Sequence, residues 1–393
     1  MSRGKLAIVG IGEVATGWYP DRTEWDMIYD TCIEAIRDSG LGKNDVEGVI
    51  SVNPMAQPKL QGEIGFGKVP EELGLKGCKD ICIVNAGGST TTNALRLAEH
   101  WIQSGIAKTV LIHHCTKHSS IPIDEAIRFF ATAGIDLQWE YPFGMTYNAL
   151  IALSMTRYMH DTKTTPEEMA SIVVALNKWA QLDPLSMNRK PVTIEKVLAS
   201  RMVTTPLHAF ECNRLGDGAS AMVVTSPELA KKLTDTPVYK LGEAVRYTQA
   251  TITQRTDREG IRKAVSDAAK EVLKEAGITL KDISILELYV AYPLGIVNLL
   301  EGLGICMPGE AGKFIMEGNT SPGGKLPVST MGDAVGRGHT GSGVGTATYV
   351  ECARQLMGRA GERQVPNCKY ILTNSAGGSG MNMIWSVFGR ELK

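Results

Sequence analysis

The sequence lacks a long apolar run, an excess of one charge and any paired cysteine motif. With 41 Lys and Arg against 42 Asp and Glu, it does not favour nucleic acid or an anionic membrane surface as a partner. The apolar run at 6–12 is too short and too rich in glycine to be a secretory signal core. Without such a core, we expect a cytoplasmic protein. Since 43% of the 393 residues are apolar, we also expect it to be globular.

The eight cysteines are scattered singly, without a C-x-x-C pair. This spacing argues against a zinc ribbon or a disulfide framework, and most of the thiols are expected to be buried. One cluster, 113–118, holds three histidines and Cys115. Because adjacent residues at a strand end point to opposite faces, the cluster favours neither a metal site nor a displaced nucleophile at Cys115. We therefore expect no metal and no separate cofactor.

Two distant passages of the chain share one pattern. In the first, a helical pattern ends at Gly40 and a strand pattern opens at Asp45. In the second, a helical pattern ends at Gly277 and a strand pattern opens at Asp282, with the same separation. The match predicts an internal repeat whose period is close to half of the chain.

The repeat continues into a strand, a glycine-rich turn and a helix in each half. In the first half the turn at 85–89 follows a strand at 80–84 and opens a helix at 90–103. In the second half the turn at 335–345, which carries His339, opens a helix at 346–357. Alternation of this kind predicts mostly parallel sheets that bind ligands where strand ends meet helix N-termini. We expect the two turns to build one site.

The pattern assigns residues 1–232 to an N-terminal half and residues 233–393 to a C-terminal half. Within the first half, the stretch 119–190 lacks clear alternation and is rich in Met, Trp and Tyr. We interpret it as an insertion over the sheet that forms a lid or a dimer contact. Its aromatic residues around 139–145 suggest an apolar pocket.

Two segments carry a resemblance to a known family. The run Cys-Asn-Arg-Leu-Gly-Asp-Gly-Ala-Ser-Ala begins at Cys212, and Gly-Ile-Cys-Met-Pro-Gly-Glu-Ala-Gly-Lys-Phe at 304–314 precedes Gly-Arg-Gly-His, which ends at His339. Together with the duplicated halves, these segments resemble the thiolase superfamily. The likeness is to the sterol carrier protein x-type and lipid-transfer-protein-like branch, which includes aldolases and acyltransferases.

The resemblance implies an α/β fold in which two βαβ-rich halves, with mixed and mostly parallel sheets, form five layers. It also implies an acyl-CoA substrate, so that coenzyme A enters as part of the substrate. A homodimer and a small OB-fold, zinc-ribbon partner subunit are implied by the family as well. Neither nucleic acid nor a membrane is expected as a partner.

The sequence departs from the family at its reactive positions. The family's nucleophilic cysteine corresponds to Gly88, so the thiol is missing, and its second cysteine corresponds to Ser375, whose hydroxyl is a poor base. The usual asparagine or histidine is replaced by Tyr289, and Tyr292 stands at the usual phenylalanine position. A tyrosine there is known from aldolase-like members and from an acyltransferase branch.

His339 matches the family histidine that polarises a thioester carbonyl or assists proton transfer. Gly88, Ser89 and Gly378 are candidates for presenting donors to an oxyanion. We predict catalytic roles for His339, Tyr289 and Ser375 and a substrate-binding role for Tyr292. Tyr289 is the candidate that takes or gives a proton, whereas Ser89 as a nucleophile would need a base that the sequence does not place.

These residues predict an enzyme that cleaves or forms a carbon–carbon bond on an acyl-CoA thioester through an enolate. Retro-aldol cleavage fits best, because it needs no acyl acceptor at Gly88. One alternative is a thiolase or acyltransferase, similar to an acetyl-CoA acetyltransferase, that uses another nucleophile or CoA directly. The other alternative is a non-catalytic subunit that binds acyl-CoA or serves as a scaffold.

Overall fold

The computed structural model describes residues 4–52, 62–132, 134–254, 259–341, 343–378 and 380–392. A mixed sheet with the strand order β3-β2-β4-β7-β1-β8-β11-β10-β9 runs through the molecule. The first half contributes β1 (Leu6–Gly17), β2 (Gly48–Val52), β3 (Asp80–Val84), β4 (Thr109–Thr116) and β7 (Asp217–Thr225). The second half contributes β8 (Val238–Tyr247), β9 (Ile285–Leu288), β10 (Tyr370–Gly377) and β11 (Asn382–Gly389).

The strand pairing confirms the predicted duplication. The order β2-β4-β7-β1 in the first half matches β9-β10-β11-β8 in the second, and each series begins with a parallel pair followed by two antiparallel pairs. β3 adds a further parallel pair to the first half, and among the described residues the second half has a parallel bridge between Leu286 and Val328 at the matching place. The two half-sheets join through a short antiparallel pairing of β1 with β8.

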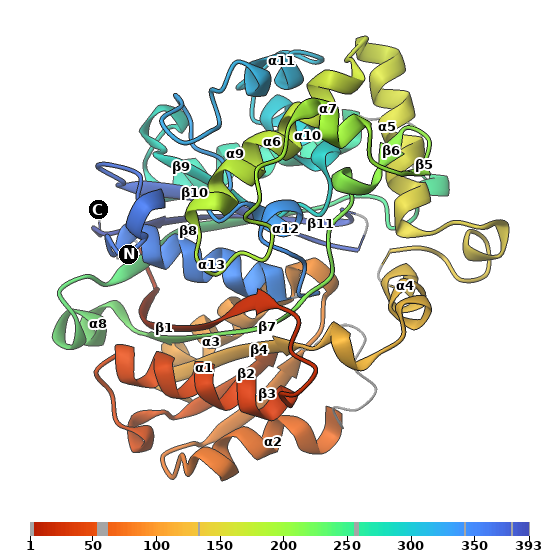
Figure 1. The fold of residues 1–393 in the computed structure, drawn as a ribbon. Helices are drawn as coiled ribbons and strands as arrows, with labels where there is room; N and C mark the ends of the chain where they lie inside the picture. Colours follow the sequence, from red (N-terminus) through yellow and green to blue (C-terminus); the bar gives the residue numbers. More distant parts are fainter. Residues whose placement is uncertain are drawn as a thin grey trace.

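Helices cover both half-sheets and fill the space between them, as Figure 1 shows. The outer layers hold α1 (Glu24–Asp38) and α2 (Gly62–Leu73) on one side, and α9 (Glu259–Ala276) and α10 (Pro293–Gly302) on the other. The central layer consists of α3 (Thr90–Ser104) and α13 (Gly343–Leu356). The result is the expected five layers.

The central layer owes its position to apolar burial from both sides. Leu95 of α3 and Tyr349 of α13 lie in one buried cluster with Ile112 of β4 and Ile371 of β10. The ring of Tyr349 meets that of Phe388 on β11 edge to face, at 5.6 Å. Because both helices are held against both half-sheets, their N-termini are fixed relative to each other.

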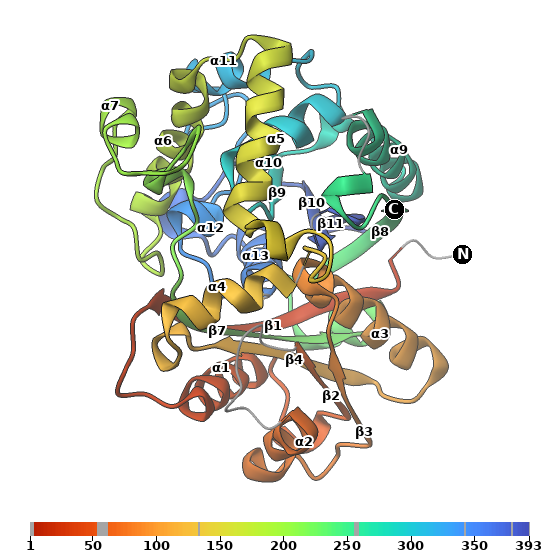
Figure 2. The ribbon, with the colours of Figure 1, turned by 90° about the vertical axis from the view of Figure 1, so that its right-hand side faces the viewer.

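The chain between β4 and β7 leaves the sheet for a longer excursion than the predicted insertion. In the view of Figure 2, two of its helices, α4 and α5, lie toward the viewer. The excursion holds α4 (Ile123–Thr132), α5 (Tyr147–Thr162), α6 (Pro166–Leu182) and α7 (Ile194–Leu198), with the small hairpin of β5 (Met202–Thr204) and β6 (Leu207–His208). Thr165 caps α6: its hydroxyl oxygen accepts from the Glu168 N–H, and its own N–H donates to the Glu168 carboxylate.

Three short helices complete the described elements: α8 (Pro227–Leu233), α11 (Ala311–Met316) and α12 (Asp333–Gly336). The boundary predicted between 232 and 233 thus lies at the end of α8, ahead of β8. In the described residues, no helix has the length and apolar character needed to cross a membrane.

Candidate active site

Three turns meet beside the N-termini of the two central helices. The turn Gly87–Ser89 opens α3, and the turn that contains His339 opens α13. Hydroxyls of Thr91 and Thr346, one from each helix, lie 2.8 Å apart. The end of β10 forms the third side, because a Cβ added at Gly88 would lie 2.4 Å from the Ala376 carbonyl oxygen. The two turns that the sequence analysis assigned to one site do lie side by side.

A cavity of about 1110 Å³ opens where these turns meet. Five of the seven residues proposed from the sequence line it, namely Gly88, Tyr289, Tyr292, His339 and Gly378. Ser89 and Ser375 are absent from its wall. The excursion contributes part of the remaining lining, including Phe130 of α4 and Asn148 of α5.

Hydrogen bonds hold both the main-chain N–H and the main-chain carbonyl of His339 in place. Its N–H donates to the Arg214 carbonyl at 2.7 Å, and its carbonyl accepts from the Gly216 N–H at 3.1 Å. The ring Nδ1 accepts a hydrogen bond from the Gly341 N–H at 3.1 Å. An accepting Nδ1 carries no proton, so the geometry assigns the proton of the neutral ring to Nε2.

The surroundings of His339 keep its ring neutral. Burial lowers its pKa to about 3, and the nearby His118 and His114 add to the effect. Phe130 of α4 covers the ring edge to face, with the centroids 5.3 Å apart. At neutral pH His339 is therefore an N–H donor toward the cavity and a poor base.

Tyr289 occupies the place where a side chain at position 88 would project. A Cβ built on Gly88 would lie 2.5 Å from Tyr289 Cε1, closer than real side chains approach. The main chain of Tyr289 is fixed by its N–H, which donates to Asn374 Oδ1 at 3.2 Å. Burial raises the pKa of Tyr289 well above its ordinary value, so the phenol is protonated at neutral pH.

The excursion supplies two polar residues that the sequence analysis did not identify. Tyr292 donates its hydroxyl to Asn148 Oδ1 at 2.6 Å and stacks on Tyr147, with the ring centroids 6.3 Å apart. Tyr147 in turn donates to the Gly378 carbonyl at 2.5 Å. The first turn of α5 thus fixes both Tyr292 and the turn after β10. The repeat gave no signal for these residues, because they lie outside it.

The two serines point away from the cavity. Asn374 and Ala376 line it, and Ser375 between them faces the opposite side of β10, where its hydroxyl lies 2.5 Å from that of Thr92. Ser89 is fully buried, and both its hydroxyl and its N–H donate to the Ala86 carbonyl. The catalytic role predicted for Ser375 and the oxyanion role predicted for Ser89 therefore lack the required geometry.

No thiol replaces the missing nucleophile. All eight cysteines are free, and burial raises the thiol pKa of every one of them. Cys212 lines the cavity, and burial raises its pKa to about 12. Cys115 on β4 is buried, which raises its pKa well above its ordinary value. In the part of the chain that the structure describes, no group of three or more His, Cys, Asp or Glu residues is arranged to hold a metal.

The aromatic residues expected to shape a pocket lie outside this cavity. Trp139 and Phe143 are 72% and 84% exposed, so they face solvent. Tyr141 and Met145 do not line the cavity either, but they pack in a small cluster with Leu150, which does. The apolar wall is formed by other residues of the same excursion.

Comparisons with known proteins agree with this geometry. A family model described as thiolase C-terminal domain-like matches residues 243–390. The solved structure of the Ltp2-ChsH2(DUF35) aldolase superposes with a TM-score of 0.83 at 27% identity, covering 98% of this chain and 97% of that chain. Over its C-terminal part this chain thus matches a thiolase family model, and over nearly its whole length it is similar to the aldolase structure.

Two curated relatives of this chain have different reactions in their names. The acetyl-CoA acetyltransferase of Methanothermobacter thermautotrophicus is 29% identical over 98% of this chain and 99% of its own length. The steroid side-chain-cleaving aldolase of Thermomonospora curvata is 27% identical over 89% of this chain and 90% of its own length. The family thus contains both acyl transfer and aldol cleavage, and the choice between them depends on the site.

Proposed function

We propose that this protein is an enzyme that cleaves a carbon–carbon bond beside an acyl-CoA thioester by a retro-aldol reaction. The observation that carries the proposal is that a tyrosine ring takes the place of the family's nucleophilic cysteine side chain. A protonated Tyr289 fills the space of the missing cysteine side chain at Gly88, and His339 keeps a neutral N–H donor beside it. Such a site can stabilise an enolate and move a proton, but it has no group to accept an acyl chain.

In the proposed reaction, the bond between the α- and β-carbons of a β-hydroxyacyl thioester breaks. The β-oxygen becomes a carbonyl, the electrons of the broken bond pass to the thioester enolate, and one proton moves from the β-hydroxyl to the α-carbon. His339 Nε2–H and the N–H groups of Gly88 and Gly378 are the proposed donors to the enolate oxygen. Because a phenol both donates and accepts, Tyr289 takes the β-hydroxyl proton as it gives its own to the α-carbon. Tyr292 lines the wall for the acyl group.

The requirement for free CoA separates this proposal from its main alternative. Retro-aldol cleavage of a β-hydroxyacyl-CoA releases an aldehyde or ketone and a shorter acyl-CoA without any added thiol. A thiolase requires CoA as a second substrate. The similarity to an acetyl-CoA acetyltransferase supports this alternative function. A panel of β-hydroxyacyl-CoA and β-ketoacyl-CoA thioesters, assayed with and without CoA, decides between them. Cleavage only of the β-ketoacyl series, and only with CoA, would overturn the proposal.

We propose further that a small OB-fold, zinc-ribbon subunit covers the cavity mouth. In support, exposed apolar residues gather on the excursion near the opening, among them Ile123, Ile127 and Leu153, which also line the cavity. The name of the similar aldolase structure couples Ltp2 with ChsH2(DUF35). Co-expression and affinity purification test the assembly, and full activity of this chain alone would refute it.

A homodimer and a cytoplasmic location complete the proposal. β3 is the edge strand of the first half-sheet, and its side chains, including Ile81 and Ile83, are only partly buried. An apolar edge strand is suited to pairing with a second copy. Light scattering of the purified protein tests the dimer. The eight free cysteines suit a reducing compartment, which fractionation of the native cells would check.

A further inference from the structure

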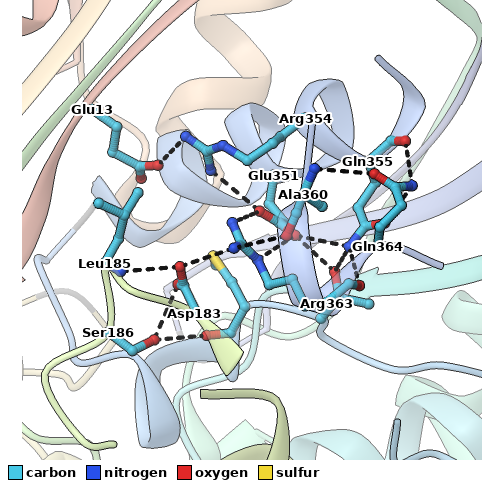
Figure 3. Close-up of polar contacts among 12 residues, drawn as sticks. Glu13, Asp183, Leu185, Ser186, Glu351, Arg354, Gln355, Ala360, Arg363 and Gln364 are labelled. Atoms are coloured by element: carbon cyan, nitrogen blue, oxygen red, sulfur yellow. Dashed lines mark hydrogen bonds and ion pairs between the residues drawn. The ribbon is translucent and has the colours of Figure 1, made fainter. Parts of the chain in front are cut away.

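Six charged side chains, five of them buried, form a closed ring behind the His339 turn. Figure 3 draws part of this ring with its partners and labels Glu13, Asp183, Glu351, Arg354 and Arg363. Arginines and carboxylates alternate around the ring in the order Arg337, Glu13, Arg354, Glu351, Arg363 and Asp183, and Asp183 returns to Arg337. The six N–O distances, taken in that order, are 2.7, 2.9, 3.2, 2.8, 3.2 and 3.0 Å.

The ring balances its own charge inside the protein. It pairs three guanidinium groups with three carboxylates, and five of its six side chains are at most 3% exposed. Burial alone would raise the pKa of Glu351, but Arg363 and Arg354 hold it at about 2. Buried ion pairs contribute little net stability relative to apolar packing, because desolvation offsets their attraction. What the ring does provide is a fixed geometry for the groups that it joins.

The ring holds the His339 turn through Arg337, which lies two residues before His339. One end of its guanidinium meets Glu13 on β1, and the other meets Asp183 at the end of α6. The Arg337 carbonyl also accepts from the Met187 N–H at 3.0 Å. The turn is therefore tied both to the first half-sheet and to the excursion.

Gly338, between Arg337 and His339, has little freedom to compensate for a movement. Its φ is +113°, and a Cβ there would lie 2.6 Å from Met187 Sδ, so the chain passes tightly against the segment that follows α6. The carboxylate of Asp183 accepts from the Leu185 N–H and the Ser186 hydroxyl, both at 3.1 Å, which fixes that segment as well. A shift of Arg337 is thus transmitted to His339.

We propose that Arg337 is a positioning residue whose bridge between Glu13 and Asp183 aims the His339 Nε2–H at the substrate carbonyl. The inference rests on the donor role given to His339 in the proposed function. The planar guanidinium spans both carboxylates, because one nitrogen donates a hydrogen bond to Asp183 while the other forms an ion pair with Glu13. A lysine keeps the charge but is a single point, so it can hold only one of the two partners well.

The test compares Arg337→Lys with Arg363→Lys, a matched control in the same ring. Both variants keep the charge at a buried position and break one two-sided bridge, so we expect similar losses of melting temperature. Arg337→Lys should lower kcat roughly ten- to a hundred-fold with KM within about three-fold, since small misplacement of a catalytic group has effects of this size. Arg363→Lys should change kcat by about three-fold at most. Equal losses of kcat in both variants would reduce the role of Arg337 to stability and overturn the proposal.

A spectroscopic readout separates this inference from the proposed function. Nitrogen NMR of labelled histidine reports whether His339 carries its proton on Nε2, and this signal requires no substrate. We expect the Nε2–H form in the wild-type protein and in Arg363→Lys, and mixed or shifted His339 signals in Arg337→Lys. An unchanged His339 spectrum in Arg337→Lys would contradict the inference even if retro-aldol activity is found. If Arg337→Lys does not fold, Glu13→Gln serves instead, because it removes the ion pair between Glu13 and Arg337. This variant must then give the same mixed or shifted His339 signals.

Discussion

The contact between Gly88 and Tyr289 makes the sharpest quantitative prediction. In Gly88→Ala the added Cβ would lie 2.4 Å from the Ala376 oxygen and 2.5 Å from Tyr289 Cε1, whereas ordinary contacts begin at 3.4 Å. The backbone and the ring must therefore each move by roughly 1 Å, and overpacking of this kind costs about 1–3 kcal/mol of unfolding free energy. Because the ring is displaced from the site, kcat falls as well.

A double-mutant cycle measured by chemical denaturation shows whether the ring causes this cost. Tyr289→Ala removes the ring from the clash, so Gly88→Ala should cost about 1 kcal/mol less in that background. Tyr239→Ala on β8 serves as the control. When it is combined with Gly88→Ala, the unfolding free energies lost in the two single variants should add within about 0.5 kcal/mol. Additivity of Gly88→Ala with Tyr289→Ala would refute the claim that Tyr289 fills the nucleophile's place.

Three further predictions concern the proton chemistry of the site. His339→Ala should lower kcat about 10²–10³-fold, the usual effect of losing one oxyanion donor, while circular dichroism shows an intact fold; near-wild-type turnover would exclude the donor role. Tyr289→Phe keeps the ring but loses the hydroxyl, so kcat should fall about 10²–10⁴-fold with little change in melting temperature, and a loss below ten-fold would exclude the proton relay. The folded-state pKa values of His113, His114, His118 and His339, at about 3 to 4, lie below the ordinary value of 6.5, so the unfolded chain binds more protons. These four histidines should therefore destabilise the folded state as pH falls from 6.5 toward 4, while the carboxyls of Glu287 and Asp333, whose pKa values burial raises, act in the opposite direction. Histidine NMR follows each ring directly and should show all four neutral at pH 5; protonation of any of them above pH 5.5 would contradict these shifts.

Local patterns in the sequence predicted the scaffold well, because each central element carries its own signals. The helix expected at 90–103 is observed as α3, and the one expected at 346–357 is observed as α13 with an earlier start. Gly105 closes α3 with a φ of 76°, as a glycine after a helical pattern indicates. The duplication then followed from matching these signals between the halves.

The orientation of Ser375 shows where sequence reasoning stopped. In a strand, successive side chains point to opposite faces, so an error of one position turns a residue from the cavity to the core. The resemblance placed Ser375 at a catalytic position, but the cavity receives Asn374 and Ala376 instead. Only the pairing register of β10 decides this, and that register depends on β9 and β11.

The contacts made by the excursion and by the ring were beyond prediction for a different reason. Tyr147 reaches the Gly378 turn across 231 positions of the chain, and Arg337 meets Glu13 across a still longer separation. Long-range contacts of this kind leave no periodic trace in the sequence. They are also the contacts that hold the site's donors in place.

The most direct test of the account is whether the protein forms a thioester enolate without an acyl-enzyme. A β-hydroxyacyl-CoA is incubated with the protein in D₂O, and mass spectrometry follows both the shorter acyl-CoA that is released and the intact protein. The account predicts one deuterium at the α-carbon of the released thioester, dependent on Tyr289 and His339, and no acyl adduct on the protein. An acyl group on a cysteine peptide, or no cleavage of the β-hydroxyacyl-CoA at full occupancy, would contradict it.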